Sequence, residues 1–119
     1  MIVIVDDDES VRRAFLRAFH ASGIPARGYS TGDEFLRNWQ DSPPDCLVLD
    51  IHMPGLSGID VQQALKTAGA NFPVVIVTAH DSAAEREQAM RLGSTTFLIK
   101  PLDMSDLINA CRQASIKSK

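Results

Sequence analysis

Three adjacent carboxylates, Asp6, Asp7 and Asp8, directly follow the apolar run IVIV near the start of the chain. Charges of the same sign at this spacing repel one another, and partial burial at the end of an apolar segment strengthens the repulsion. The cluster therefore predicts that a cationic group from elsewhere in the chain, or a bound cation, lies next to it.

Three further apolar runs also end in residues that can take part in chemistry. CLVL is followed by Asp50, VVIV by Thr78 and FLI by Lys100. A carboxylate can act as a nucleophile and form an aspartyl phosphate. A hydroxyl and an ammonium can then bind the phosphoryl oxygens, while a metal ion neutralises their charge. The pattern therefore indicates phosphoryl chemistry at Asp50, with Thr78 and Lys100 as further catalytic residues.

A single ammonium does not neutralise the carboxylates of Asp6, Asp7 and Asp50 together. Mg²⁺ suits them best, because it binds one or two carboxylates, keeps water ligands and completes its shell with phosphate oxygens. The interpretation of Asp8 stays open, since a carboxylate also suits the start of a helix. The alternative to a metal site is that the acids form a solvated loop.

Short apolar runs alternate with amphipathic segments along the whole chain. Consecutive apolar residues predict buried strands, and apolar residues three and four apart predict helices. The predicted strands are 2–5, 24–29, 46–50, 73–78 and 96–100. The predicted helices include residues 11–19, 31–40, 61–68, 89–93 and 104–111.

This alternation predicts an α/β fold, a doubly wound five-stranded parallel sheet with helices on both faces and right-handed crossovers. The carboxyl ends of parallel strands share one edge of the sheet, and α/β proteins bind ligands there. The polar residues at the strand ends should therefore converge. Pro25 favours an edge position for the second strand. A cis peptide bond between Lys100 and Pro101 would aim the Lys100 ammonium at the acids.

The composition narrows the classes of protein to consider. A length of 119 residues, 45% of them hydrophobic, suits one domain, and we expect residues 1–119 to form it. The net charge of -3 argues against contact with nucleic acid. Cys46 and Cys111 form no metal-binding or redox motif, which indicates two reduced core cysteines. With no membrane-spanning run and no signal peptide, we expect a cytoplasmic protein without membrane contact.

Four motifs, IVIVDDDES, LVLDIHMPGLSG, VVIVTAH and FLIKPL, occur in this order along the chain. Together they resemble the receiver domain of response regulators in two-component signalling systems, and this likeness extends over essentially the whole chain. A FixJ-like regulator is one response regulator to which such a domain could belong. The resemblance implies a flavodoxin-like fold with strand order 2-1-3-4-5.

The resemblance also implies residue roles. Asp50 would be the phosphoacceptor, and Asp6 and Asp7 would bind Mg²⁺ together with Asp50 and the backbone carbonyl of His52. Thr78 would donate a hydrogen bond to the phosphoryl group.

Further roles implied by the resemblance concern the switch. Lys100 would pair with the phosphoryl group, and Phe97 occupies the family's aromatic switch position, where tyrosine is frequent. His52 and His80 lie at positions that flank the phosphoryl group and influence its lifetime. Zinc binding by these two histidines is a second interpretation of the pair.

A receiver domain would be a signalling switch rather than an enzyme, although it assists its own phosphorylation and dephosphorylation. A sensor histidine kinase would phosphorylate it. The fourth helix, fifth strand and last helix would then change and favour a phosphorylation-dependent homodimer. Regulation of transcription through an effector domain absent from this chain is the main expectation. A stand-alone receiver that acts by protein–protein contacts is the alternative.

Two other classes share parts of the pattern. Haloacid-dehalogenase-like phosphatases have a strand followed by Asp-x-Asp, so Asp6 would be their nucleophile. That interpretation leaves Asp50 unexplained, and no acidic pair follows Lys100 at a strand end. A flavodoxin-like flavin-binding protein would need a phosphate-binding loop rich in Ser, Thr and Gly after the first strand, where this chain has carboxylates.

Overall fold

Strands and helices alternate along residues 1–117, the part of the chain that the computed structural model describes, with only the backbone described at 95, 116 and 117. The elements are β1 (Ile2–Val5), α1 (Glu9–Ala21), β2 (Ala26–Tyr29), α2 (Gly32–Asn38), β3 (Cys46–Leu49), α3 (Gly58–Thr67), β4 (Val74–Thr78), α4 (Ala83–Arg91), β5 (Ser94–Ile99) and α5 (Met104–Lys117). Each predicted element is present, with ends that differ by a few residues.

The five strands form one parallel sheet in the order β2-β1-β3-β4-β5. This confirms the predicted fold class, and the proline-containing second strand lies at an edge. Strand β2 lies on one side of β1, and β3, β4 and β5 follow one another on the other side. The strand order therefore reverses between β1 and β3, which is where open α/β sheets bind ligands.

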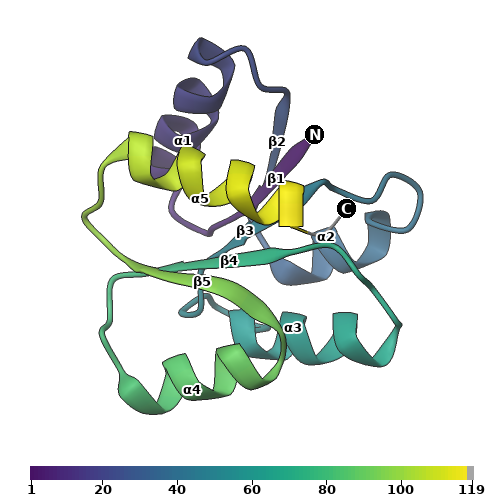
Figure 1. The fold of residues 1–119 in the computed structure, drawn as a ribbon. Helices are drawn as coiled ribbons and strands as arrows, with labels where there is room; N and C mark the ends of the chain where they lie inside the picture. Colours follow the sequence, from purple (N-terminus) through teal and green to yellow (C-terminus); the bar gives the residue numbers. More distant parts are fainter. Residues whose placement is uncertain (118–119) are drawn as a thin grey trace.

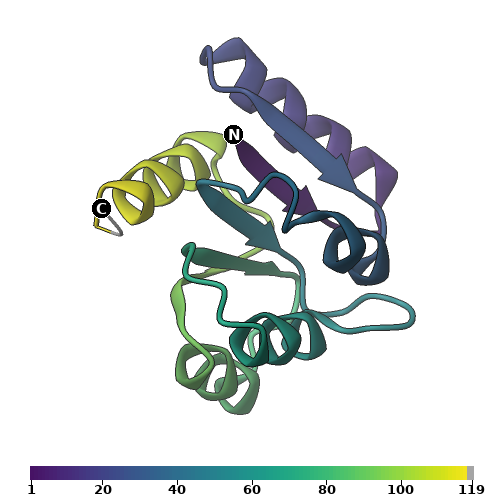
Figure 2. The same ribbon diagram turned by 90° about the vertical axis from the view of Figure 1, so that its right-hand side faces the viewer.

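Helices α1 and α5 cover one face of the sheet, and α2, α3 and α4 cover the other (Figure 1, Figure 2). Side chains alternate along each strand. In β1, Ile2 and Ile4 pack with α1 and α5, whereas Val3 and Val5 pack with α2 and α3. Both faces are therefore apolar, which explains why the central strands consist of consecutive apolar residues.

Polar side chains at the helix starts accept backbone N–H groups that no helical carbonyl can satisfy. Asp8 caps α1, Thr31 caps α2 and Ser82 caps α4. At α3, Ser57 and Asp60 form a reciprocal capping box. These caps place each helix start just beyond a strand end, close to the edge at which the polar residues gather.

The two cysteines are free and buried, as predicted. A hydrogen bond with the Cys111 thiol, and then burial, raise the pKa of Cys46 far above its ordinary range, so its thiol stays protonated. Within the described part of the chain, no helix has the length and apolar character required to cross a membrane.

Candidate functional site

The register of the sheet brings Asp6 and Asp50 together. Val5 of β1 pairs with Leu49 of β3. The next residues, Asp6 and Asp50, therefore lie side by side at the ends of neighbouring strands. The backbone N–H of Asp50 donates to the carbonyl of Val5 at 3.1 Å. One carboxylate oxygen from each of Asp6, Asp7 and Asp50 lies within 4.8 Å of the others.

This oxygen cluster fits a hard divalent cation. Asp6 and Asp50 are buried, whereas Asp7 is exposed, so the cluster is open to solvent on one side. Carboxylate oxygens close together and partly open to water are the donors that Mg²⁺ uses, because the ion keeps several water ligands. Among the described residues, no other group of three His, Cys, Asp or Glu side chains is close enough to hold a metal. His52 and His80 are not part of such a group in the described part of the chain.

The Lys100 ammonium reaches this cluster from the end of β5. Its Nζ lies 2.8 Å from Oδ2 of Asp6 and 3.6 Å from Oδ2 of Asp50. The Lys100–Pro101 peptide bond is cis, and the Lys100 N–H donates to the Thr78 carbonyl at 2.7 Å. Lys100 carries one positive charge and the acidic cluster three negative ones, so Lys100 alone does not neutralise the cluster.

Asp6 is held more firmly than Asp50. Besides its close pair with Lys100, Asp6 accepts the Asp8 N–H through Oδ1 at 2.9 Å, and Arg12 donates to its backbone carbonyl at 2.8 Å. Asp8 itself accepts the Val11 N–H and caps α1. The open interpretation of Asp8 is therefore resolved in favour of a helix cap.

Among the described residues, the Asp50 carboxylate makes only long contacts. Its Oδ1 lies 3.4 Å from the N–H of His52 and its Oδ2 lies 3.6 Å from Lys100. Burial raises the pKa of Asp50, and the charges of Asp6 and Asp7 raise it further, while Lys100 lowers it. A buried carboxylate with loosely held oxygens is better placed to attack an electrophile than one that is tightly paired, which favours Asp50 over Asp6 as the nucleophile.

The approach of α3 to Asp50 depends on Gly58. A Cβ atom at this position would lie 2.3 Å from the Asp50 carbonyl oxygen. The Gly58 N–H also donates to the Ile51 carbonyl at 2.8 Å. Any side chain here would push the start of α3 away from the end of β3 and displace the carboxylate.

Thr78 is fully buried at the end of β4, next to β5. Its Oγ1 accepts the N–H of His80 at 3.2 Å. Thr78 pairs with Ile99, the residue before Lys100. Thr78 and Lys100 therefore lie at the ends of adjacent strands, at the same edge of the sheet, as the sequence predicted.

A family model described as the response regulator receiver domain matches residues 2–112. The chain belongs to this family. It is 32% identical over 114 residues to response regulator protein TodT of Pseudomonas putida, an overlap that covers 96% of this chain and 50% of TodT. The chain spans about half the length of curated relatives that it matches.

Solved structures agree with the family. The receiver domain of the Francisella response regulator 1452 is 28% identical with a TM-score of 0.92, and the match covers 99% of this chain and 98% of that one. FixJ-N is 29% identical with a TM-score of 0.90, covering 97% and 92%. Response regulators are signalling proteins of two-component systems rather than classical enzymes.

In this receiver domain the aromatic ring at position 97 lies partly buried against the α2–α3–α4 face. The guanidinium carbon of Arg86 lies 5.0 Å from the centre of the Phe97 ring, a cation–π contact. Arg86 also pairs with Asp81 at 3.0 Å. The first turns of α4 therefore contact the proposed switch residue directly.

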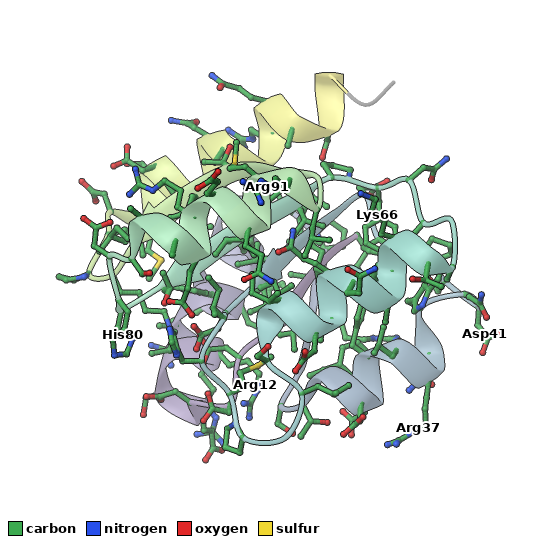
Figure 3. The ribbon with its side chains drawn as sticks, turned by 90° about the horizontal axis from the view of Figure 1, so that it is seen from below. Arg12, Arg37, Asp41, Lys66, His80 and Arg91 are labelled. Carbon is green, nitrogen blue, oxygen red and sulfur yellow. The ribbon has the colours of Figure 1, made fainter. Side chains whose placement is uncertain are left out.

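The backbone N–H groups of His52 and His80 point at the side chains of Asp50 and Thr78, and the two imidazole rings lie next to each other. Their ring centres are 4.3 Å apart, and Nε2 of His52 lies 2.9 Å from Oε1 of Glu85 on α4. Figure 3 shows His80 beyond the end of α4 that is opposite to Arg91.

Sequence reasoning identified the residues at the strand ends but missed Glu85, Arg86 and Arg12. Each of these is a charged residue on a helix with a largely polar surface, and such residues usually face solvent. Glu85 is 33 residues from His52 in sequence. No local pattern could have linked the two.

Proposed function

We propose that this receiver domain is a phosphorylation-dependent switch and that residues 1–119 form one such domain. A sensor histidine kinase donates a phosphoryl group to Asp50 with Mg²⁺ as the cofactor. The observation that carries this proposal is the buried Asp50 carboxylate, grouped with those of Asp6 and Asp7 within 4.8 Å and facing Lys100.

The proposed reaction is a direct displacement at phosphorus. A carboxylate oxygen of Asp50 forms a bond to phosphorus while the phosphorus–nitrogen bond of the kinase phosphohistidine breaks. The electron pair of that bond leaves with the imidazole of the kinase. The Lys100 ammonium pairs with one phosphoryl oxygen, and the Thr78 hydroxyl donates to another. With an acyl phosphate as donor, the bond that breaks is phosphorus–oxygen and the carboxylate leaves.

The proposed cation ligands are the carboxylates of Asp6, Asp7 and Asp50 with the backbone carbonyl of His52. When bound, Mg²⁺ neutralises charge on the phosphoryl oxygens and on the crowded acids. The chain's own residues position the reacting groups: Asp6 holds Lys100 in place, and Gly58 keeps the start of α3 close to Asp50.

The proposed output begins with the added charge. A phosphoryl group brings about two negative charges and three acceptor oxygens. Thr78 moves towards it and leaves space that the Phe97 ring can occupy, which alters the surface formed by α4, β5 and α5. Because Phe97 has no hydroxyl, this output uses the shape of the ring and not a hydrogen bond from it.

Downstream, we propose control of transcription through an effector domain outside this chain, since the curated relatives are about twice as long. The α4–β5–α5 surface then supports a phosphorylation-dependent homodimer, and the domain itself contacts neither nucleic acid nor membrane. A stand-alone receiver acting by protein–protein contacts remains the second candidate. The proposed compartment is the cytoplasm, because two free buried cysteines suit a reducing environment.

Intact-mass analysis after incubation with acetyl phosphate and Mg²⁺ tests this function. The wild-type chain should gain one phosphoryl group, whereas EDTA or the Asp50→Asn substitution should prevent the gain. An Asp50→Asn variant that still gains a phosphoryl group would contradict the assignment of Asp50 as the phosphoacceptor. If Asp6→Asn abolishes labelling while Asp50→Asn does not, Asp6 is the nucleophile, as in the dehalogenase-like interpretation.

A further inference from the structure

One residue connects the phosphoacceptor to helix α4. The backbone N–H of His52 points at Oδ1 of Asp50 from 3.4 Å, and its ring nitrogen Nε2 lies 2.9 Å from Oε1 of Glu85. The Glu85 side chain is 28% exposed, and its own N–H donates to the Ser82 cap. Glu85 is thus fixed in the first turn of α4 and holds the His52 ring from there.

The held ring is part of a pair beside the site. The His80 ring lies 4.3 Å from that of His52, at an angle of 50°, and the His80 N–H donates to the Thr78 hydroxyl oxygen. Both rings therefore belong to residues whose backbones contact a reacting group. Figure 3 shows His80 near the end of α4 that is opposite to Arg91. Glu85 belongs to the first turn of this helix.

We propose that Glu85 is a positioning residue for the reaction at Asp50. It holds the His52 imidazole beside the phosphoacceptor, where the ring restricts the approach of water, and so couples the lifetime of the aspartyl phosphate to the position of α4. This inference rests on the proposed function and deepens it. The controlled step is hydrolysis: water oxygen bonds to phosphorus, the bond from phosphorus to the Asp50 oxygen breaks, and the water protons pass to phosphate and solvent.

Helix α4 is suited to such coupling because few apolar contacts hold it. Ala89 is its one buried residue among those described, and Met90 is 47% exposed. Glu85 and Arg86 add polar contacts with His52 and Phe97 to this small apolar area. A displacement of α4 during signalling would draw Glu85 away from His52 and admit water to the phosphoryl group.

The test compares phosphoryl loss from Asp50 in matched variants, after labelling with acetyl phosphate and removal of the donor, at one pH and one Mg²⁺ concentration. Glu85→Ala should accelerate the loss by about threefold to tenfold, the rate equivalent of one ordinary net hydrogen bond. Glu85→Gln keeps an oxygen that accepts the imidazole N–H, so its rate should stay close to that of the wild type. Glu87→Ala, which removes an exposed glutamate of the same helix paired with Arg91, should leave the rate unchanged.

A double variant separates positioning from a general effect on the fold. In a His52→Ala background, Glu85→Ala should have no further effect, because its partner is absent. A further acceleration in that background would overturn the proposal, as would a Glu85→Gln rate equal to that of Glu85→Ala. If the wild type is never labelled, the proposed function fails. If it is labelled and Glu85→Ala loses phosphate at the wild-type rate, only this inference fails.

Discussion

Helices α4 and α5 lie on opposite faces of the sheet, and different forces hold them. Among the α5 residues whose side chains are described, four are buried against the sheet and α1, namely Leu107, Ile108, Cys111 and Ala114. In the described part of the chain, helix α4 buries Ala89 alone, and its polar contacts include those with His52, Gln62 and Phe97. Apolar packing is lost only at a high cost, whereas hydrogen bonds and ion pairs near the surface exchange partners at a small net cost. The comparison indicates that α5 is attached to the sheet more firmly than α4, so a displacement of α4 would cost less free energy.

The buried side of α4 also contains an imperfect contact. The Gln62 side chain is buried beneath α4 and donates to the Ala89 carbonyl at 3.1 Å, but its Oε1 has no partner among the described residues. Burying a polar atom without a partner is unfavourable. The contact between α3 and α4 is therefore weaker than an apolar contact of the same size, which agrees with a helix that can shift.

The largest expected effect concerns α5, the more firmly attached helix. Leu107→Ala removes a fully buried side chain and should lower the free energy of unfolding by about 2–5 kcal/mol. Met90→Ala on α4 serves as the control and should change it by less than about 0.5 kcal/mol, since the side chain is largely exposed. Urea unfolding followed by circular dichroism measures both. Equal losses would mean that α4 and α5 are attached alike.

The next effect compares two helix caps of the same type. Ser57→Ala and Ser82→Ala each remove a hydroxyl that accepts a helix N–H, at a cost of about 1 kcal/mol. At α3, whose Val61 and Leu65 are buried, the loss should lower global stability. At α4 it should instead accelerate amide exchange within that helix and leave the unfolding midpoint nearly unchanged. A large global loss for Ser82→Ala would contradict the comparison.

A smaller effect is expected for the contact between Arg86 and Phe97. Arg86→Ala removes the cation–π contact and the exposed pair with Asp81, and should cost about 0.5–1 kcal/mol. Because the guanidinium covers the ring in this structure, its removal should also shift the Phe97 ring signals in an NMR spectrum. Arg91→Ala at the other end of α4 is the matched control and should leave those signals in place.

The smallest expected effect is that of the negative charge on Asp50, the proposed phosphoacceptor. Since burial raises the pKa of Asp50 in the folded chain, the folded state binds that proton more tightly than the unfolded state does. Without metal, stability from this group is complete at low pH and is lost as the pH rises through the raised pKa. Asp50→Asn should therefore be more stable than the wild type in EDTA at neutral pH, by a margin that shrinks on acidification.

The difference in stability between Asp50→Asn and the wild type should stay small, because the attraction of Lys100 offsets part of the effect of burial on the pKa of Asp50. Urea unfolding of both proteins in EDTA, at pH values on either side of the ordinary carboxyl pKa, measures it. Mg²⁺ should stabilise the wild type more than Asp50→Asn, because the variant lacks one of the proposed cation ligands. A wild type that is more stable than Asp50→Asn in EDTA at neutral pH would contradict this account of the acidic cluster.

Much of the fold followed from local pattern. Runs of consecutive apolar residues in β1, β3 and β4 reflect strands buried on both faces, and this condition acts at every position of the run. Element ends were less certain: β3 ends at Leu49 and β5 at Ile99, so Asp50 and Lys100 lie just beyond the strands instead of inside them. The ends of helices and strands depend on capping contacts and on pairing with neighbouring strands, and the local sequence pattern does not specify either.

By itself, the sequence determined that acids, a hydroxyl and an ammonium meet at one sheet edge, because each ends an apolar strand and parallel strands end on the same side. Only the tertiary structure decided which of these side chains contact one another and how closely. Lys100 pairs closely with Asp6 and loosely with Asp50, Asp8 caps α1, and Glu85 reaches His52. These choices depend on side-chain directions set by the packing of whole helices on the sheet, and a charged residue on α4 has the same local sequence whether it faces water or the site.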